Sequence, residues 1–369
     1  MHVALVVHDF NLNFGQGRYG VEIVRRLAGR CRLSVIANSF GVDRIDGVDF
    51  RQVKAWRRHA FSTVLSFVPG AEIMARRCGC DLIHAQGLTC WSADVITGHI
   101  CNAARARASA STDRRSRWFM RLIIPLELAF YRQRRARHLI AISRVLEREI
   151  RKEYGWAKDS TVIYHGTDTE VFRPPTDDVE KQRMRQRFKL PVAGWVWIFI
   201  GEAIKGLRQV IDALPRYPEA CLLVVSRSSF SNYRRQAEQL GVGGRIVFHG
   251  FDPHPEEAFR AADVFVYPSD YDPFGMVASE AMATGLPVII GADIGAAELV
   301  SPGENGLLCA PARMESIFEG LDRLRADPVE AGRLGARGRE TILQVSWKLC
   351  ANQTLQVYEK VFEQIRSAS

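Results

Sequence analysis

The stretch DVFVYPSDYDPFGMVASEAMATGLPVIIG, residues 263–291, decides the fold. Its first seven residues are mostly apolar and branched or aromatic, which is typical of a buried strand. A loop, a helix-forming run at 276–285 and a second apolar run at 286–291 follow. Strand, loop, helix and strand in this order predict a parallel βαβ unit. Asp272 then lies in the loop after the first strand, and Glu280 lies one to two turns into the helix.

Apolar runs separated by amphipathic segments recur along the whole chain. We therefore predict an α/β protein with two facing Rossmann-like, doubly wound parallel sheets and a cleft between them. The strands expected in the first sheet include residues 2–7, 32–37, 81–85, 94–99 and 138–143, and the five expected in the second sheet are residues 195–201, 220–226, 245–250, 263–269 and 286–291.

Turn-forming residues interrupt this alternation around 156–176, where Gly166 and the pair Pro174–Pro175 occur. We place the domain boundary there. The prediction is an N-terminal domain over 1–165 and a C-terminal domain over 166–345.

Length and composition fit a folded, two-domain protein of 369 residues, with 47% hydrophobic and 25% charged residues. No stretch is apolar for the roughly 20 residues of a membrane-spanning helix, and the start, MHVALVVHDF, is typical of a strand rather than a signal peptide. Of the eight cysteines only Cys78 and Cys80 are close together, separated by one residue. Reduced thiols and a cytoplasmic location are expected.

Charge is distributed unequally between the two predicted domains. Residues 1–165 hold 27 Lys and Arg against 14 Asp and Glu, a net charge of +13, whereas the remaining residues hold 23 against 27, a net charge of −4. This asymmetry suggests that the first domain meets an anionic partner. A solvated basic face without a partner is the alternative.

The two acids around Phe274 and Gly275 suggest a ligand site. A helix N-terminus offers unpaired amides to a phosphate, and glycine allows close approach to the backbone. Acids on either side of these amides can accept hydrogen bonds from sugar hydroxyls. The simpler interpretation is that Asp272 caps the helix and Glu280 pairs with an arginine.

The motif DPFGMVASEAMATGLPVI resembles that of family-4 retaining glycosyltransferases, which have the GT-B architecture, with Asp272 in place of the commoner Glu. Further similar blocks follow in the family's order along nearly the whole chain. They are FGQGRYGVEIVRRLA, DVITGH, HLIAISRVLEREI, VIYHGTDTEVFRP, FIGEAIKGLRQVIDAL, VFHGFDPHPEEAFRAADVFVYPS and GENGLLCAP. The final segment, 346–369, resembles the family's last helix, which crosses back onto the first domain.

The resemblance implies roles for individual residues. Glu280 would bind the donor ribose and Asp272 the hydroxyls of the transferred sugar, while Lys205 would neutralise the departing diphosphate. The catalytic set is thus Asp272, His99 and Lys205, with His99 beside the sugar from the first domain. Donor binding would also use the backbone of Phe274, Gly275, Met276 and Val277, and a loop containing Gly15 and Gly17.

Lys205 also has a physical rationale. Cleavage of a glycosyl phosphate builds negative charge on the leaving group, so a fixed cation stabilises the transition state more than the ground state. The family resemblance implies no metal and no cofactor beyond the nucleoside diphosphate sugar itself. A solvated lysine, and for His99 a core histidine, are the plainer interpretations.

The sequence departs from the family pattern at two places. Glu202 follows Gly201 where the family usually has Arg, and the loop to Lys205 is short; Arg208 and Arg227 are the candidates for supplying the missing charge. The segment VVSRSSFSNY lacks the family's glycine-rich turn. These departures leave open a protein that binds a nucleotide sugar without transferring it.

Residues 102–137 carry ten arginines against two acids, with aromatic and apolar residues between them. Such a segment suits an anionic membrane surface, and Pro125 predicts a bend. The alternative is that the apolar residues pack on the first domain and the arginines are solvated. The residues concerned are Trp118, Phe119, Met120, Ile123, Ile124, Phe130 and Tyr131.

The expected function is therefore transfer of a hexose to a glycan or lipid-linked acceptor, in cell-surface polysaccharide or lipopolysaccharide synthesis. The expected location is the cytoplasm, peripheral on the inner face of the cytoplasmic membrane, with UDP-glucose as the first donor candidate and GDP-mannose as the second. A nucleotide-sugar epimerase, or a non-enzymatic basic protein that binds nucleic acid or anionic lipid, is the alternative; no nucleic-acid-binding motif occurs.

Overall fold

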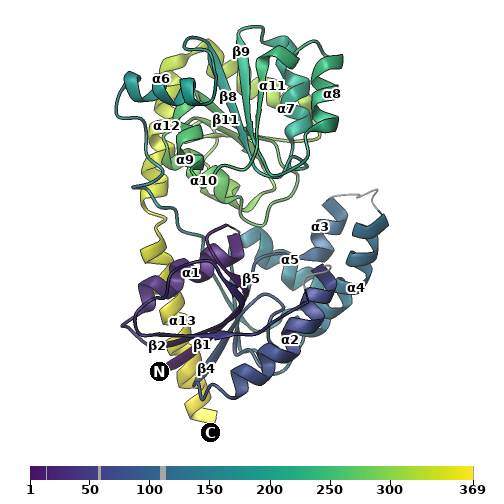
Figure 1. Cartoon of the computed structure of the whole chain (residues 1–369), viewed down its shortest axis with the longest axis vertical. Coiled ribbons are helices and arrows are strands. Elements are labelled where there is room, and N and C mark those ends of the chain that lie inside the picture. Colours follow the sequence, from purple (N-terminus) through teal and green to yellow (C-terminus); the bar gives the residue numbers. More distant parts are fainter. Residues whose placement is uncertain (14, 57–59, 109–113, 369) are drawn as a thin grey trace. The chain divides into compact units, whose positions relative to one another are not determined.

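The computed structural model describes residues 1–13, 15–56, 60–108 and 114–368 (Figure 1). Contacts divide the chain into two compact units. The N-terminal unit comprises Met1–Gly166 and Trp347–Ser369, and the C-terminal unit comprises Thr167–Ser346. The sequence had suggested divisions after residues 165 and 345.

The N-terminal unit contains a seven-stranded parallel sheet in the order β3-β2-β1-β4-β5-β6-β7. Its central strands are buried on both faces, which explains their nearly continuous apolar sequence. The strands are β1 (His2–Phe10), β2 (Arg32–Phe40), β3 (Val48–Gln52), β4 (Leu82–Gln86), β5 (Val95–Gly98), β6 (His138–Ala141) and β7 (Asp159–Val162).

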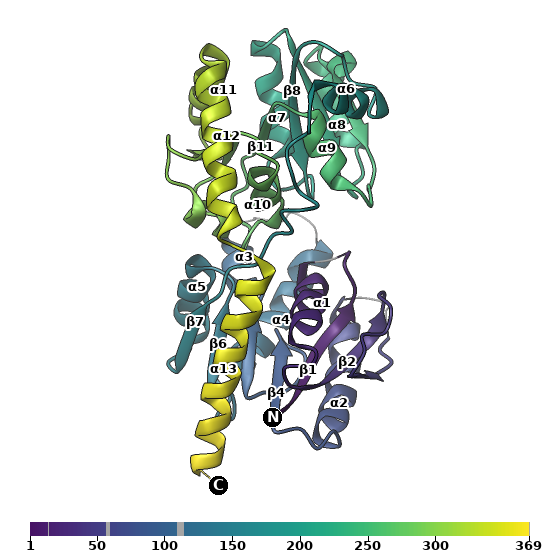
Figure 2. The ribbon, with the colours of Figure 1, turned by 90° about the vertical axis from the view of Figure 1, so that its left-hand side faces the viewer.

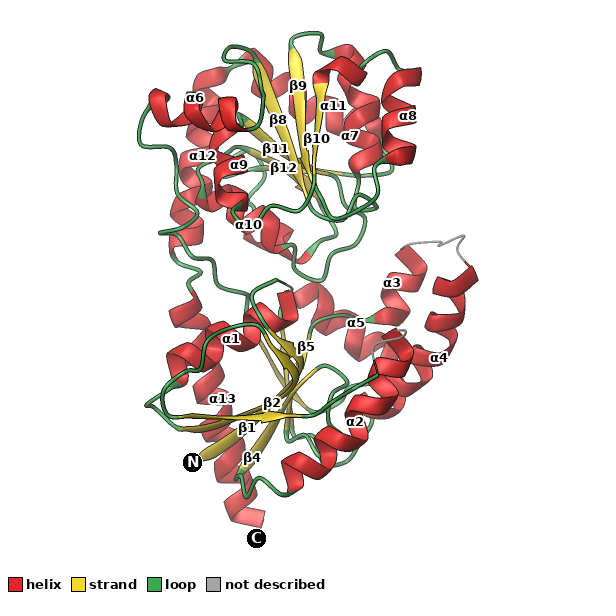
Figure 3. Ribbon diagram, viewed as in Figure 1, coloured by secondary structure: helices red, strands yellow, loops and turns green. Residues whose placement is uncertain are grey.

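Helices cover this sheet (Figure 3). They are α1 (Gly15–Leu27), α2 (Ala60–Arg76), α3 (Asn102–Ala108), α4 (Arg114–Tyr131), α5 (Arg144–Tyr154) and α13 (Trp347–Ala368). The last of these comes from the far end of the chain and packs against α1, β4 and β6 (Figure 2). Residues 347–368 thus belong to the core of the N-terminal unit.

The C-terminal unit contains a six-stranded parallel sheet in the order β10-β9-β8-β11-β12-β13. The sequence predicted five of these strands and missed the last, which has three residues. The strands are β8 (Trp195–Ile200), β9 (Ala220–Val225), β10 (Ile246–His249), β11 (Val264–Tyr267), β12 (Val288–Gly291) and β13 (Leu307–Cys309).

Its helices are α6 (Asp178–Arg187), α7 (Leu207–Ala213), α8 (Ser231–Gln239), α9 (Pro255–Ala261), α10 (Met276–Ala283), α11 (Met314–Ala326) and α12 (Pro328–Leu343), with short 3-10 helices η1 (Leu214–Arg216), η2 (Gly243–Arg245) and η3 (Gly295–Leu299). The expected fold class, two Rossmann-like parallel α/β domains, is confirmed.

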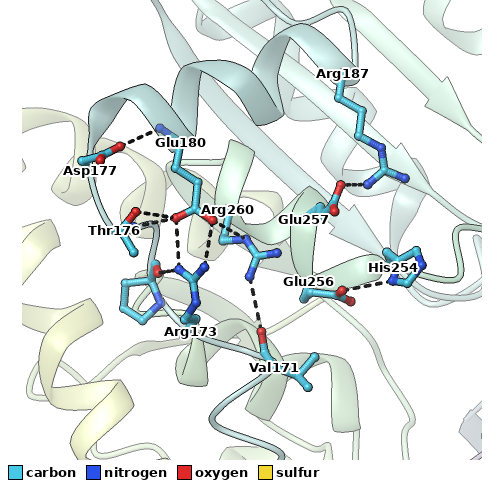
Figure 4. Close-up of polar contacts among 11 residues, drawn as sticks. Val171, Arg173, Thr176, Asp177, Glu180, Arg187, His254, Glu256, Glu257 and Arg260 are labelled. Atoms are coloured by element: carbon cyan, nitrogen blue, oxygen red, sulfur yellow. Dashed lines mark hydrogen bonds and ion pairs between the residues drawn. The ribbon is translucent and has the colours of Figure 1, made fainter.

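An ion-pair network holds α6 against α9 (Figure 4). Glu180 receives two hydrogen bonds of 3.0 Å from Arg173 and one of 2.7 Å from the Thr176 backbone. Arg260 of α9 lies 3.6 Å from the same carboxylate. The hydrogen bonds from Arg173, and then those from Thr176, lower the pKa of Glu180 to about 2. The network fixes the start of the C-terminal unit.

Each sheet has one point where the strand order reverses. In the N-terminal unit this point lies between β1 and β4, and in the C-terminal unit between β8 and β11. The loops leaving two such neighbouring strands diverge, so the carboxyl ends at this point form the usual ligand site of an open α/β sheet.

Among the described residues, the structure contains no helix of the length and apolarity that a membrane span requires. The eight cysteines are all free.

Candidate functional site

The predicted donor residues gather at the reversal point of the C-terminal sheet. The loop carrying Lys205 follows β8, and the loop carrying Asp272 follows β11, its neighbour in the sheet. Lys205 Nζ lies 2.8 Å from Asp272 Oδ2. Residues 67 positions apart thus form one ion pair where a ligand is expected.

Asp272 is 8% exposed, and several contacts hold it. The Tyr267 hydroxyl, at the end of β11, donates to Oδ2 over 2.9 Å, and the Phe274 backbone N–H approaches Oδ1 at 3.3 Å. The Asp272 carbonyl accepts a hydrogen bond from Gly295. Oδ2 therefore accepts two hydrogen bonds, whereas Oδ1 keeps capacity to accept one from a ligand hydroxyl.

Helix α10 begins immediately after this loop. Gly275 precedes it at a φ of 87°, in the left-handed region that glycine adopts without strain. No side chain caps the helix, and Met276 and Val277 are half-buried. The first amides of the helix are thus uncapped by side chains, as a phosphate site at a helix N-terminus requires.

Glu280 lies one turn further along α10 and is 5% exposed. Its neighbour Ser279 donates to the Met276 carbonyl over 2.8 Å and accepts from Thr167 at 3.0 Å. A carboxylate held this deep in the unit has restricted rotamers, so it suits a fixed hydroxyl partner better than a mobile one.

The loop after β8 is a short turn. The Lys205 backbone N–H donates to the Glu202 carbonyl over 2.9 Å, and Gly206, at a φ of 102°, starts α7. A Cβ at Gly206 would lie 2.4 Å from the Pro268 carbonyl oxygen, so only glycine permits this approach to the β11 loop. The turn therefore places Lys205 over Asp272.

The departures from the family pattern lie at the border of this loop. Glu202 is exposed. Burial is the largest cause that raises the pKa of Tyr267, followed by the charge of Asp272 and then that of Glu202. Arg227 lies 3.8 Å from the centre of the Phe251 ring, and Arg208 is exposed. Among these cations only Lys205 pairs with Asp272.

In the N-terminal unit, the expected glycine loop is a helix. Gly15 and Gly17 both lie in the first turn of α1, which corrects the prediction of a loop. A Cβ on Gly17 would lie 2.5 Å from the Asp9 carbonyl oxygen. Glycine lets the helix start against the end of β1, so no extended loop is needed.

His99 directly follows β5 at the carboxyl edge of the same sheet. Its Nε2 lies 2.7 Å from Oε1 of Gln86, the last residue of β4, and the Gln86 carbonyl accepts from Gln16 of α1. Gln86 therefore connects His99 to the residue between Gly15 and Gly17. Three predicted donor-site residues of the N-terminal unit thus share one edge of the sheet.

Aromatic rings surround His99. The ring centres of Tyr19 and His165 lie 5.2 Å and 5.7 Å from that of His99. Burial, followed by the charge of His165, lowers the pKa of His99 well below the usual value. His99 is therefore neutral near pH 7, with Nε2–H donated to Gln86.

Sequence reasoning missed Tyr267 and Gln86. Tyr267 reads as one more aromatic residue of a buried strand, and Gln86 as the polar end of another. Both residues end strands at the strand-order reversals, where ligands usually bind. Recognising this requires the order of the strands in each sheet, which the sequence alone does not give.

The arginine-rich residues 102–137 have surroundings that differ from one part of the segment to another. Helix α4 continues through Pro125. Its residues Ile123, Phe130 and Tyr131 are buried, as the packing alternative expected, whereas Trp118 is 56% exposed. Residues 109–113 lie outside the described residues. One face of α4 thus packs on the unit and another faces outward.

The candidate site brings together groups suited to an anion and to hydroxyl groups. Within the described ranges, no cluster of three or more His, Cys, Asp or Glu side chains has the arrangement of a metal site. A cation, uncapped amides and two carboxylates are suited to a sugar joined to a diphosphate.

Two parallel α/β units, each with candidate ligand groups at its strand-order reversal, are the architecture of the GT-B fold. Solved structures share this fold. Sucrose-phosphate synthase from Thermosynechococcus elongatus matches with a TM-score of 0.81 at 24% identity, covering 99% of this chain and 100% of that one. WaaG, a glycosyltransferase of lipopolysaccharide biosynthesis, matches with a TM-score of 0.81 at 18% identity, covering 96% and 99%.

The chain belongs to the glycosyltransferases with a Glycosyltransferase Family 4 domain, matched over residues 15–171, and a Glycosyl transferases group 1 domain, matched over residues 180–341. The structure of Anabaena Alr3699/HepE with UDP and glucose also shares the fold, with a TM-score of 0.77 and 18% identity over 98% of this chain and all of that one.

Curated relatives match parts of the chain. The D-inositol 3-phosphate glycosyltransferase of Xylanimonas cellulosilytica is 31% identical over 236 residues, 60% of this chain and 56% of that protein. The lipopolysaccharide core biosynthesis mannosyltransferase LpsB of Rhizobium meliloti is 30% identical over 221 residues, 56% and 61%. The chain thus spans little more than half the length of the curated relatives it matches.

Proposed function

We propose that the protein is a retaining glycosyltransferase that moves a hexose from a nucleoside diphosphate sugar to a glycan or lipid-linked acceptor. The observation that carries this proposal is the Lys205–Asp272 ion pair of 2.8 Å beside the start of α10. A cation, a hydroxyl acceptor and uncapped amides lie together at a strand-order reversal.

In the proposed reaction, the bond between the sugar C1 and the diphosphate oxygen breaks, and its electron pair leaves with the diphosphate. Lys205 and the amides at Met276 and Val277 stabilise that charge. The acceptor hydroxyl forms the new bond to C1 and gives its proton to the departing diphosphate oxygen. Asp272 holds hydroxyls of the transferred sugar, and Glu280 holds the donor ribose. Retention of configuration comes from the family resemblance.

The N-terminal unit contributes His99, Gly15 and Gly17 in this proposal. His99 contacts the transferred sugar as a neutral hydrogen-bonding group, which the lowered pKa supports. The close packing at Gly17 brings the start of α1 to the end of β1, and the amides at a helix start are suited to bind phosphate.

Metal independence is part of the proposal. Transfer of a sugar from a nucleoside diphosphate commonly relies on a divalent cation to neutralise the diphosphate leaving group. Here Lys205 and the α10 amides take that role, and the donor is the co-substrate. Turnover that persists in the presence of EDTA supports this arrangement, and loss of turnover restored by Mg²⁺ or Mn²⁺ contradicts it.

UDP-glucose is the first donor candidate and GDP-mannose the second. The Anabaena protein of the same fold was solved with UDP-glucose, and the relative from Rhizobium meliloti is named a mannosyltransferase of the lipopolysaccharide core. The name of the Rhizobium relative supports an acceptor in lipopolysaccharide or cell-surface polysaccharide synthesis.

We also propose peripheral association with the inner face of the cytoplasmic membrane through α2 and α4, which pack together. Trp118 is 56%, Leu65 51% and Ile73 53% exposed, and Arg121 lies 5.7 Å from the Trp118 ring. Exposed apolar and cationic residues on neighbouring helices fit an anionic lipid surface. Binding to anionic vesicles that falls with added salt supports this, and salt-insensitive binding contradicts its electrostatic part.

A panel of UDP, GDP and ADP sugars tests the enzymatic proposal. Purified protein is expected to release the nucleoside diphosphate from one donor, and NMR of the glycosylated product is expected to show the donor's anomeric configuration. Conversion of the donor into another nucleotide sugar without an acceptor identifies an epimerase instead. Binding without any turnover identifies a binding protein.

A further inference from the structure

A cavity of about 710 Å³ opens at the amino edge of the N-terminal sheet. Its lining includes Asp81, Asp94, Arg137 and Asp159, which lie at or just before the starts of β4, β5, β6 and β7. Gln86 is the last residue of β4 and His99 follows β5, so both lie at the opposite edge of the sheet. The cavity is thus distinct from the candidate donor site.

Three arginines that follow α4 line this cavity, namely Arg134, Arg135 and Arg137. Arg135 Nε lies 3.4 Å from Asp94 Oδ1. In the described part of the chain, the guanidinium groups of Arg134 and Arg137 make neither a hydrogen bond nor an ion pair. Two of the ten arginines of residues 102–137 therefore bring guanidinium groups without a hydrogen-bonded carboxylate to a concave surface, where the charge of Arg137 also acts on Asp94.

Lys158 adds a third charge without an anionic partner. Its Nζ donates to the carbonyl oxygens of Gln133, Arg134 and Ala136 over 2.7, 2.9 and 2.5 Å. These neutral acceptors fix the ammonium group at the wall but leave its charge uncompensated. Burial, and then the charge of Arg137, lower the pKa of Lys158, as expected beside unneutralised positive charge.

The carboxylates of the lining have other partners. Asp81 accepts from the His2 backbone over 2.7 Å, Asp94 from the Ile83 backbone over 2.9 Å, and Asp159 pairs with Lys360 at 2.7 Å. Each carboxylate thus accepts a hydrogen bond from the backbone of a neighbouring strand or from a side chain of α13. The lining holds four cationic side chains against these three carboxylates.

We propose that this cavity binds a phosphate group, which Arg134 and Arg137 contact through paired N–H donors while the fixed ammonium of Lys158 supplies charge. A guanidinium fork matches two phosphate oxygens. The volume accommodates a phosphate with an organic substituent. Inorganic phosphate, a soluble phosphate ester and a lipid headgroup share this chemistry.

Inorganic phosphate is the first probe, titrated calorimetrically into the full chain at constant ionic strength. The Lys205→Ala background removes the lysine of the candidate donor site. We expect Arg134→Gln/Arg137→Gln to weaken phosphate binding about tenfold or more, since each charged hydrogen bond is lost. The matched control Arg25→Gln/Arg77→Gln removes two exposed arginines of the same unit and is expected to bind as before.

Two results overturn the proposal: equal phosphate affinity in the Arg134→Gln/Arg137→Gln protein, or binding that Lys205→Ala alone abolishes. A measurement without variants at the cavity guards against misfolding. Phosphate is expected to slow phenylglyoxal modification of Arg134 and Arg137, measured by peptide mass spectrometry, and not that of Arg25. Equal rates with and without phosphate contradict the site.

Vesicles distinguish the sources of the phosphate group. If phosphatidylglycerol vesicles bind the Lys205→Ala protein and Arg134→Gln/Arg137→Gln weakens that binding, the ligand is a lipid headgroup. If the double variant changes only the affinity for inorganic phosphate and glycerol phosphate, the ligand is soluble. Both results support the site. This test does not depend on transferase activity, so its outcome is separate from that of the proposed function.

Discussion

At the residue scale, the account rests on Asp272 and the two groups that bind its Oδ2. Lys205 and the Tyr267 hydroxyl approach the same oxygen at 2.8 and 2.9 Å. The ion pair orients Lys205 before a donor arrives, so little reorganisation is needed when the leaving group gains charge. Lys205 and Tyr267 should therefore affect turnover more than folding.

Lys205→Ala is expected to lower kcat by about 10² to 10³, the usual effect of losing one electrostatic contact to a transition state. The measurement is the rate of nucleoside diphosphate release, together with a circular dichroism melt. Lys348→Ala, at an exposed position on α13, serves as the control. Near-wild-type turnover by folded Lys205→Ala protein removes this lysine from the mechanism.

Tyr267→Phe removes one hydroxyl and keeps the ring. We expect kcat to fall about 10- to 100-fold, because a hydrogen bond to a charged group contributes about 1.5–3 kcal/mol. The donor KM should change less, since Tyr267 positions Asp272 and is a positioning residue in this account. A rise in KM at constant kcat is inconsistent with that role.

The sequence predicted the residues of the motif but not their partners. Asp272, Glu280 and Lys205 could be identified because the family motif names them. The role of the Tyr267 hydroxyl could not be identified from the motif. Its contact with Asp272 depends on a turn that brings the loop after β11 back to the end of that strand. His99 was predicted, whereas its partner Gln86 depends on β4 and β5 being neighbours.

At the element scale, short turns between strands and helices place the site. Gly275 adopts a φ of 87°, and a Cβ there would lie 3.2 Å from Ile294 Cδ1. A residue other than glycine in this region costs about 1–2 kcal/mol. The start of α10 thus depends on one backbone conformation.

Gly275→Ala is therefore expected to destabilise the protein by about 1–2 kcal/mol and to weaken donor binding by shifting the α10 amides. Urea unfolding and calorimetric titration with the nucleotide sugar measure the two effects. Gly332→Ala, where a Cβ would meet nothing within 4 Å, is the control in the same unit. Unchanged stability and affinity would mean that this turn does not set the site.

Sequence patterns predicted the central strands and one edge strand, β10, and missed the other three edge strands. The three missed strands are β3, β7 and β13, each of which ends a sheet. Edge strands pair on one side only and tolerate polar residues, so VDFRQ and DSTV lack the apolar pattern of a strand. The family resemblance implied a loop at Gly15 and Gly17, where the structure has the first turn of α1.

At the scale of the whole molecule, the two units differ in how they respond to acid. Burial lowers the pKa of His84 and His165 to about 3 and that of His138 to about 4, all in the N-terminal unit. The unfolded chain binds protons at these histidines below about pH 6.5, whereas the folded unit does not. Stability is therefore full above that pH and falls as the pH decreases towards 4.

We expect the N-terminal unit to unfold first on acidification. Hydrogen exchange followed by mass spectrometry between pH 7 and 4, corrected for intrinsic exchange rates, should show earlier loss of protection in β4, β5 and β6 than in β8 and β11. The carboxylate of Glu180 in the C-terminal unit keeps its stabilising charge until the pH approaches about 2. Simultaneous loss in both units contradicts this order.

The central claim is that the C-terminal unit holds a nucleoside diphosphate sugar between Glu280 and Asp272, and titration calorimetry with UDP-glucose and GDP-mannose tests it most directly. We expect one of these donors to bind the wild-type protein at a single site, Glu280→Gln to weaken that binding about tenfold or more through the lost ribose contact, and Lys348→Ala to leave it unchanged. Binding of equal strength in the Glu280→Gln protein, or no binding of either nucleotide sugar to the folded wild type, would contradict the account.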